Sequence, residues 1–213
     1  MTTWPLDLVK PLLLFALVAM SVLGCSGGRE SGPTTAETVT SGGSTVLVWG
    51  EGGQGVVLAH GASYDAASWE DQARAMADRG LAVAAVEDLS ADAVADAVGF
   101  LRAERDSTKV TLVGSSAGAA PVVDAASSDP ALADGVVLLS PAGGDLSSVG
   151  SVPALVLYSE EESYADGIES MIAAAAGVDV ETRPLPGDRH GQGIFNGDQA
   201  DAVVDAVVKF AGR

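Results

Sequence analysis

Several chemically useful side chains are scarce in this sequence. It contains one cysteine, Cys25, and two histidines, His60 and His190. A lone cysteine excludes an intramolecular disulfide, and the two histidines are the only candidates for a histidine base. The glycine-rich patterns that bind phosphate, G-x-x-x-x-G-K and G-x-G-x-x-G after the first long strand, are missing, and no cluster of metal-ligating side chains is visible. We therefore expect neither a metal nor an organic cofactor.

Basic residues are also few. The chain has 11 Lys and Arg residues against 29 Asp and Glu residues, for a formal net charge of −18. This excess of negative charge argues against nucleic acid as a partner, against electrostatic docking to anionic lipid, and against polyanionic substrates. We interpret most of the carboxylates as a solvated acidic surface.

The apolar run Leu12–Leu23 follows Lys10 and is too short to span a bilayer, but it suits the core of a secretion signal. It ends in Val22-Leu23-Gly24-Cys25, which resembles the lipobox of bacterial lipoproteins, where the cysteine becomes the lipidated first residue of the mature chain. The alternative is an ordinary secretory signal with a chance cysteine. The resemblance predicts a signal peptide over residues 1–24 and a protein held outside the cytoplasm by lipid on Cys25.

Residues 25–43 are rich in Ser, Gly and Thr and predict a flexible tether behind the lipidated cysteine. The remaining 44–213 are enough for one domain with a single core. In this domain apolar runs alternate with amphipathic segments, which predicts an α/β fold with a mostly parallel sheet and helices on both faces. The expected strands are Thr45–Trp49, Val56–Ala59, Leu81–Val86, Lys109–Val113, Val136–Leu139, Ala154–Tyr158 and Val178–Thr182. The expected helices are Ser68–Arg79, Ala91–Glu104, Ala117–Ala126, Tyr164–Ala176 and Asp198–Ala211.

The pentapeptide Gly114-Ser115-Ser116-Ala117-Gly118 has the form G-x-S-x-G, with a predicted strand before it and a predicted helix after it. Such a tight strand-to-helix reversal strains the central serine and holds its hydroxyl above the sheet edge, with the helix N-terminus behind it. Ser116 is therefore the candidate nucleophile. Ser115 would lie on the wrong side of the turn.

The order of elements and motifs over 44–213 resembles the α/β-hydrolase family, in particular its small esterases and dienelactone-hydrolase-like members. Pro141–Val152 is too short to hold the helical cap that many members carry, so we expect the α/β-hydrolase fold without a cap domain. The resemblance implies that His190, just after the last strand, is the catalytic base. It also implies that His60, in the turn Ala59-His60-Gly61-Ala62, shapes the oxyanion loop instead.

The same resemblance places the triad's acid just after the strand ending at Tyr158, where Glu160, Glu161 and Glu162 follow in a row. We predict Glu162, with Glu161 next and Asp166 third. By the same analogy, the backbone N–H groups of Ala117 and Ala62 form the oxyanion hole, and the Ser63 hydroxyl could add to it.

The chain order Ser116, Glu162, His190 is that of the family. It predicts a serine hydrolase that acts on the ester bond of a small-molecule acyl substrate. Two alternatives remain: a non-catalytic binding lipoprotein on the same fold, and a thioesterase, acyltransferase or peptidase with the same triad. The aromatic side chains of Tyr64, Trp69, Tyr164 and Phe195 either line the mouth of the site or pack the loops around it.

Overall fold

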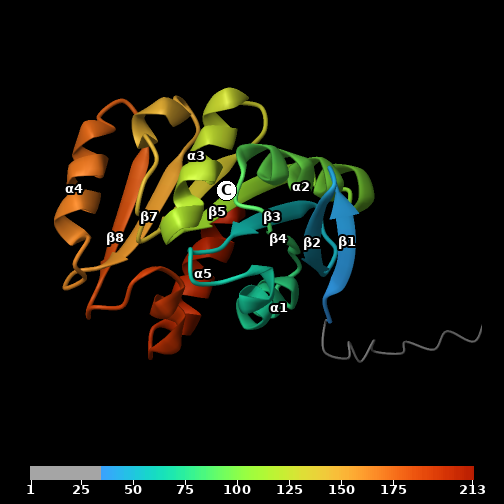
Figure 1. Ribbon diagram of the computed structural model, residues 1–213, viewed down its shortest axis with the longest axis horizontal. Helices are drawn as coiled ribbons and strands as arrows, with labels where there is room; N and C mark the ends of the chain where they lie inside the picture. Colours follow the sequence, from blue (N-terminus) through green and yellow to red (C-terminus); the bar gives the residue numbers. More distant parts are fainter. Residues whose placement is uncertain (1–34) are drawn as a thin grey trace, which may run out of the picture. The chain divides into compact units, whose positions relative to one another are not determined.

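A computed structural model describes residues 35–213. The predicted signal peptide 1–24, Cys25 and the first part of the predicted tether lie outside the described residues. The described part is built on one sheet of eight strands in the order β1-β2-β4-β3-β5-β6-β7-β8 (Figure 1). The strands are β1 (Glu37–Ser41), β2 (Ser44–Trp49), β3 (Gln54–Ala59), β4 (Ala82–Val86), β5 (Lys109–Ser115), β6 (Gly135–Leu139), β7 (Ala154–Ser159) and β8 (Val180–Leu185).

The strands from β4 through β3 to β8 are parallel, whereas β2 runs antiparallel to β4 and β1 antiparallel to β2. The central strands are buried along nearly their whole length; β4, for example, reads Ala-Val-Ala-Ala-Val and every residue is inaccessible. Strands with two covered faces need apolar side chains in both directions, which explains the continuous runs in the sequence.

Helices α2 (Ala91–Glu104), α3 (Ala119–Ser128) and α4 (Ala165–Ala174) lie on one face of the sheet, and α1 (Glu70–Ala77) and α5 (Ala200–Ala211) on the other (Figure 1). Each face has its own hydrophobic core. Val57 and Leu112 pack under α2 and α3, while their neighbours Val56, Leu58 and Val113 pack against α1 and α5. The alternation follows from the period of two in a strand. Both cores hold the sheet rigid beneath its carboxyl edge. Among residues 35–213, no helix has the length and apolar character needed to cross a membrane.

The predicted tether is wrong at its C-terminal end, because Glu37–Ser41 form strand β1. This strand pairs with β2 in a hairpin whose turn is Gly42-Gly43, both with positive φ. A Gly-Gly turn between β-branched runs is a hairpin signal, but Val39 is the only apolar residue of β1, so composition hid it. Ser41 Oγ donates a hydrogen bond of 3.0 Å to the Ala-rich helix α2 at Asp96 O, and Arg105 forms an ion pair with Glu37.

The other elements appear close to their predicted positions, and four short 3-10 turns are added: η1 (Ala66–Trp69), η2 (Ser116–Gly118), η3 (Leu146–Val149) and η4 (Gly191–Asn196). Strand β8 shows the largest shift, running over Val180–Leu185 rather than Val178–Thr182. It includes Pro184, which lacks an N–H and is tolerated because β8 is an edge strand. Between β6 and β7, the connection Pro141–Val152 contains the single turn η3.

Candidate active site

The candidate nucleophile Ser116 lies between the end of β5 and α3, in a strained turn. Its φ is +50°, in the left-handed region that non-glycine residues rarely adopt. The glycines of the motif allow close contacts: a Cβ on Gly118 would lie 2.5 Å from the carbonyl oxygen of Ala59, and one on Gly114 would lie 2.5 Å from that of Gly118. Larger residues would push the elbow away from β3. The small-residue spacing thus sets the position of the serine.

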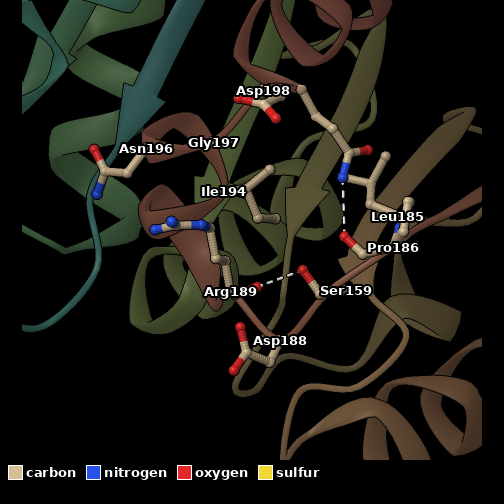
Figure 2. Close-up of a pocket in the computed structure, with 11 residues that line it drawn as sticks. Ser159, Leu185, Pro186, Asp188, Arg189, Ile194, Asn196, Gly197 and Asp198 are labelled. Carbon is tan, nitrogen blue, oxygen red and sulfur yellow. Dashed lines mark hydrogen bonds between the residues drawn. The ribbon is translucent and has the colours of Figure 1, made fainter.

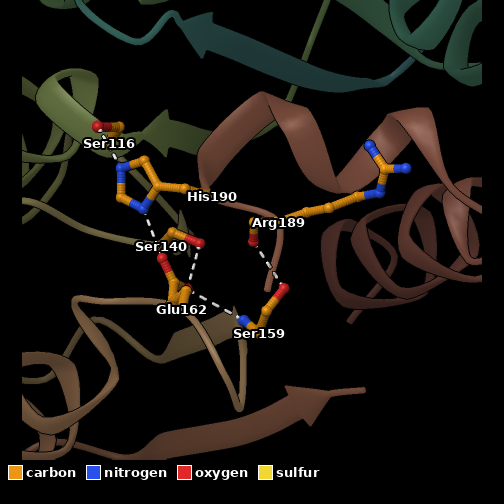
Figure 3. A network of polar contacts seen from close by, with 6 residues as sticks. All are labelled: Ser116, Ser140, Ser159, Glu162, Arg189 and His190. Atoms are coloured by element: carbon orange, nitrogen blue, oxygen red, sulfur yellow. Dashed lines mark hydrogen bonds and ion pairs between the residues drawn. The ribbon is translucent and has the colours of Figure 1, made fainter. Parts of the chain in front are cut away.

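His190 reaches this serine from the loop between β8 and η4. The Nε2 atom of His190 lies 2.8 Å from the Oγ atom of Ser116, and its Nδ1 is hydrogen-bonded to Oε2 of Glu162 (Figure 3). An ionised carboxylate only accepts hydrogen bonds, so Nδ1 carries the proton and Nε2 is left to accept from the serine hydroxyl. This arrangement holds the tautomer that a general base needs.

Glu162 follows β7 in a tight turn and is almost fully buried, with 1 % of its side chain exposed. Its second oxygen, Oε1, accepts hydrogen bonds from Ser140 Oγ at 2.7 Å and from the Ser159 N–H at 3.0 Å (Figure 3). A buried carboxylate is tolerated only when its lone pairs are satisfied. Here three donors on three different segments satisfy it.

The rival acids lie elsewhere. Glu160 and Glu161 are exposed, and their backbone N–H groups bond the carbonyls of Leu185 and Gly187, at 2.9 Å each, which fixes the turn after β7. Asp166 is exposed in the first turn of α4. Of the four carboxylates considered, Glu162 is the one that the structure brings to His190. Its role in catalysis stays a prediction.

The other serine of the motif, Ser115, is fully buried, and its Oγ has no hydrogen-bond partner within residues 35–213. His190 bonds Ser116 instead. The hydrogen bonds of His60 go to backbone carbonyls and not to Ser116. Its Nδ1 lies 2.9 Å from the Gly61 carbonyl oxygen, and its Nε2 lies 3.2 Å from that of Glu87. The buried His60 ring thus fastens the loop after β3.

That loop carries one predicted oxyanion donor. The Gly61 carbonyl accepts from the Tyr64 N–H at 3.0 Å, and the Gly61 N–H donates to Gln192 Oε1 at 2.9 Å. The N–H of Ala62 has no partner in the described part of the chain. Ala117 is the second residue of η2, and the first N–H groups of a helix find no partner within it. Both donors of the predicted hole are thus free to bind an oxyanion.

A cavity of about 260 Å³ opens above Ser116. Among residues 35–213, the ionisable side chains that line it are His190 and two tyrosines. Tyr64 and Tyr164 are 41 % and 51 % exposed at its mouth. Trp69 and Phe195 instead pack the loops, buried edge to face with ring centroids 5.9 Å apart. The lining residues are Gly61, Ala62, Ser63, Tyr64, Ser115, Ser116, Tyr164, His190, Gly191 and Gln192.

A second cavity, of about 290 Å³, is lined by the end of β7 and by the segments 185–189 and 194–199 (Figure 2). Its wall includes Ser159, whose Oγ donates to the Arg189 carbonyl at 2.6 Å, and Gln199, whose Nε2 donates to the Pro186 carbonyl at 2.9 Å. Neither Ser116, Glu162 nor His190 lines it. Although slightly larger, this cavity contains none of the predicted triad residues, and the hydrogen bonds in its wall brace the loop that carries His190.

Three residues of the site escaped the sequence reasoning: Ser140, Ser159 and Gln192. Ser140 has a φ of +44° at the end of β6, and Ser159 ends β7. Each follows a predicted strand at the carboxyl edge, where ligands bind in parallel sheets, and that position could have singled out the two serines. Gln192 has no such signal beyond being polar two residues after His190.

No protein-family model matches the sequence, and no curated protein matches it either. Solved structures do match. A serine hydrolase involved in carbazole degradation, CarC, superposes with a TM-score of 0.65 at 16 % identity, over 84 % of this chain and 99 % of the other. The esterase Est1E from Butyrivibrio proteoclasticus gives 0.63 at 15 % identity, over 83 % and 97 %. A hormone-sensitive lipase from a metagenome library gives 0.68 at 16 % identity, over 84 % of each chain.

The chain has the α/β-hydrolase fold. The fold prediction is confirmed, including the mostly parallel sheet with helices on both faces. In this α/β-hydrolase fold the serine elbow, the acid turn and the histidine loop follow β5, β7 and β8 at the carboxyl edge of the sheet. A fold shared at such low identity does not determine the activity. The chemistry at that edge depends on the residues of the site.

Proposed function

We propose that the protein is a serine hydrolase of carboxylic esters that works through Ser116, His190 and Glu162. The observation that carries the proposal is the unbroken hydrogen-bond chain from the strained Ser116 hydroxyl through His190 to the buried Glu162. A binding protein has no need of a buried carboxylate behind a histidine. Solved structures with the same fold include a serine hydrolase, an esterase and a lipase.

The chemistry follows from the positions of the protons. Ser116 Oγ attacks the acyl carbonyl carbon while His190 Nε2 takes the hydroxyl proton. Glu162 stabilises the resulting imidazolium through Nδ1–H. The carbonyl oxygen becomes an oxyanion, which the N–H groups of Ala62 and Ala117 would bind. His190 then gives its proton to the departing alkoxide, leaving an acyl-enzyme. Water, deprotonated by the same nitrogen, releases the acid and restores Ser116.

The cavity supports a small, uncharged acyl substrate. Its volume of about 260 Å³ suits a short acyl chain and a compact alcohol. A charged group would find no opposite charge in the walls, and a polyanion would meet a protein of net charge −18. We therefore favour uncharged esters over charged ones.

The decisive experiment is labelling with a fluorophosphonate probe, which reacts only with an activated serine. The wild-type protein should be labelled on Ser116 and should hydrolyse p-nitrophenyl acetate. The Ser116→Ala variant should lose labelling and about 10⁴–10⁶ of kcat with its fold intact. The matched control is Ser115→Ala, which removes the neighbouring hydroxyl and should still be labelled. A wild-type protein that neither labels nor turns over would favour the binding lipoprotein.

The leaving group needs a separate comparison. One acyl group should be presented as an ester, a thioester and an amide, together with an alcohol acceptor to detect transfer. The ester hydrolase predicts the highest kcat/KM on the ester and free acid as the product. Higher kcat/KM on the thioester or the amide, or acyl transfer to the alcohol, would assign the site to a thioesterase, peptidase or acyltransferase instead.

We also propose that the protein acts outside the cytoplasm, attached to the membrane by lipid on Cys25. The support is the sequence Val22-Leu23-Gly24-Cys25 after a short apolar run. Stable anchoring takes more than one acyl chain. Mass spectrometry of the membrane fraction should find the chain beginning at Cys25 with added acyl mass. The Cys25→Ser variant should leave that fraction. A mature chain that starts elsewhere without lipid would contradict this.

A further inference from the structure

Gln192 is a buried polar side chain beside the site, with no part in the triad. It lies two residues after His190, in the first turn of η4, and is 5 % exposed. A buried amide is costly unless both its ends are bonded. Where those bonds go therefore shows what the residue holds in place.

Both ends of the amide are bonded, and each bond goes to a different segment. Oε1 accepts from the Gly61 N–H at 2.9 Å, and Nε2 donates to Ser68 Oγ at 2.8 Å. The partners settle which end is oxygen, since a backbone N–H can only donate. The Ser68 hydroxyl in turn donates a hydrogen bond to the Asp65 carbonyl at 2.5 Å. Gln192 thus joins the histidine loop to the oxyanion loop and to the turn that follows it.

Because the Gly61 N–H is bonded to Gln192, Ala62 supplies the N–H that is available in the oxyanion loop. The Gly61 N–H donates to Gln192, and the Gly61 carbonyl accepts from Tyr64 and His60, so both backbone groups of this residue are bonded. The next N–H along, that of Ala62, has no hydrogen-bond partner among residues 35–213, and Ala62 lines the cavity above Ser116. The Gly61 N–H belongs to the His60–Gly61 peptide and the Ala62 N–H to the next peptide along, so the two planes meet at the Gly61 Cα. Without the Gln192 oxygen, the first plane could rotate about that Cα and shift the second, which carries the Ala62 N–H.

Gly191, the residue between His190 and Gln192, packs closely against the serine elbow. Gly191 has a φ of +55°, and a Cβ there would lie 2.8 Å from Ser115 Oγ and 3.3 Å from Ser116 Cβ. The loop is therefore pressed against the elbow at this point. His190 meets the nucleophile on one side of that contact, and Gln192 meets the oxyanion loop on the other.

We propose that Gln192 is a positioning residue that aligns the oxyanion loop with the Ser116–His190 pair. It touches no reacting atom. It acts through Gly61 on the Ala62 N–H, so its contribution is felt in the tetrahedral state and not in the binding of the ester. The proposal rests on the proposed hydrolase function.

The test uses Gln192→Met, which keeps the length and removes both hydrogen bonds. Its kcat on p-nitrophenyl acetate should fall about 10- to 100-fold, less than the loss of an oxyanion donor outright, with KM within about threefold of wild type. The acid limb of the pH–rate profile should stay in place, because the contacts of His190 are unchanged. Affinity for phenylboronic acid, which forms a tetrahedral adduct on the serine, should fall in parallel with kcat.

The matched control is Gln72→Met, the same substitution at a glutamine of α1 that does not line the cavity above Ser116. It should keep wild-type kcat. If Gln192→Met does not fold, Ser68→Ala replaces it, since that change frees the Nε2 end and leaves the Gly61 bond. Its kcat should fall about two- to fivefold, with a matching fall in boronate affinity.

The outcomes separate the two proposals. A Gln192→Met protein with kcat and boronate affinity within about twofold of wild type overturns the inference, as does wild-type kcat in Ser68→Ala when Gln192→Met is unfolded. The inference is likewise overturned if the Gln192→Met protein is less stable than wild type but keeps its kcat and boronate affinity. In each of these cases the wild-type enzyme is active. A wild-type protein inert toward esters and fluorophosphonate overturns the hydrolase itself.

Discussion

The ring of Tyr164 stacks on the imidazole of His190, with centroids 4.6 Å apart and 32° between the planes. Tyr164 is the residue before α4, two positions after Glu162, so one turn supplies both the carboxylate and the aromatic neighbour of the histidine. Half of the tyrosine is exposed. The ring limits the rotation of the imidazole, and its electron-rich face favours the imidazolium that forms during the reaction.

Removing this ring should weaken catalysis without destroying it. Contacts between aromatic rings contribute about 0.5–1.5 kcal/mol, so Tyr164→Ala should lower kcat about 2- to 10-fold. Tyr164→Phe is the control, because the stacking does not use the hydroxyl, and it should keep most of the activity. Steady-state kinetics of the two variants separates the contribution of the ring from that of the hydroxyl. Equal losses in both would assign the effect to the hydroxyl.

The three adjacent glutamates should differ sharply in a kinetic comparison. Glu162→Gln keeps the shape but can donate to Nδ1, which favours the wrong tautomer of His190, and it should cost up to ~10⁴ in kcat. Glu160→Gln and Glu161→Gln change exposed charges and should cost less than about tenfold. Each variant is checked for folding by circular dichroism. A dead Glu161→Gln beside an active Glu162→Gln would contradict the assignment of the acid.

Strand β1 should be needed for the stability of the domain. A chain starting at residue 44 would lose β1 and leave the backbone groups of β2 unpaired at the sheet edge, a template for association. It should melt at lower temperature and scatter light on storage. A chain starting at residue 35 keeps β1 and serves as the reference. Equal melting temperatures and equal scattering would mean that the hairpin adds nothing.

Glu181 on β8 should make stability depend on pH. A hydrogen bond from Arg213 is the largest of the effects that lower the pKa of Glu181, with the charges of Arg213 and Arg183 acting in the same direction. A lowered pKa in the folded state stabilises the fold above the ordinary value of 4.5. That stability is lost as the pH falls through the lowered pKa.

Glu181→Gln should therefore be slightly less stable than wild type at pH 7, by less than about 1 kcal/mol because the pair is exposed to solvent. The difference should shrink in strong acid and in high salt. Urea midpoints at pH 7 and in acid measure it, with Glu51→Gln as the control, since Glu51 forms no ion pair within residues 35–213. A gap that widens in acid would contradict the sign.

The parts that were predictable from sequence are those governed by short-range constraints. The elbow around Ser116 needs small residues at fixed spacing, and helix α2 has the bounds Ala91–Glu104 that its apolar period predicts. The acid was harder, because three glutamates share one turn. The prediction of Glu162 rests on its position relative to the end of the strand, and the structure brings this glutamate to His190.

What escaped prediction depends on contacts between distant segments. Gln192 and Gly61 are 131 residues apart, and no local sequence pattern predicts the hydrogen bond between them. Trp69 and Phe195 were equally compatible with the mouth of the site and with packing; their edge-to-face contact placed them in the core. β1 was missed because an edge strand buries so little that its composition resembles a linker.

The left-handed backbone of Ser116 has a consequence for engineering. A non-glycine residue held there costs of the order of 1–3 kcal/mol of conformational strain, so the protein is strained at a residue whose side chain the proposed reaction requires. Glycine would relax that backbone, and an inert Ser116→Gly protein should withstand heat better than its active parent. Heat resistance in an active form must therefore come from positions remote from the elbow, where stability and reactivity do not compete.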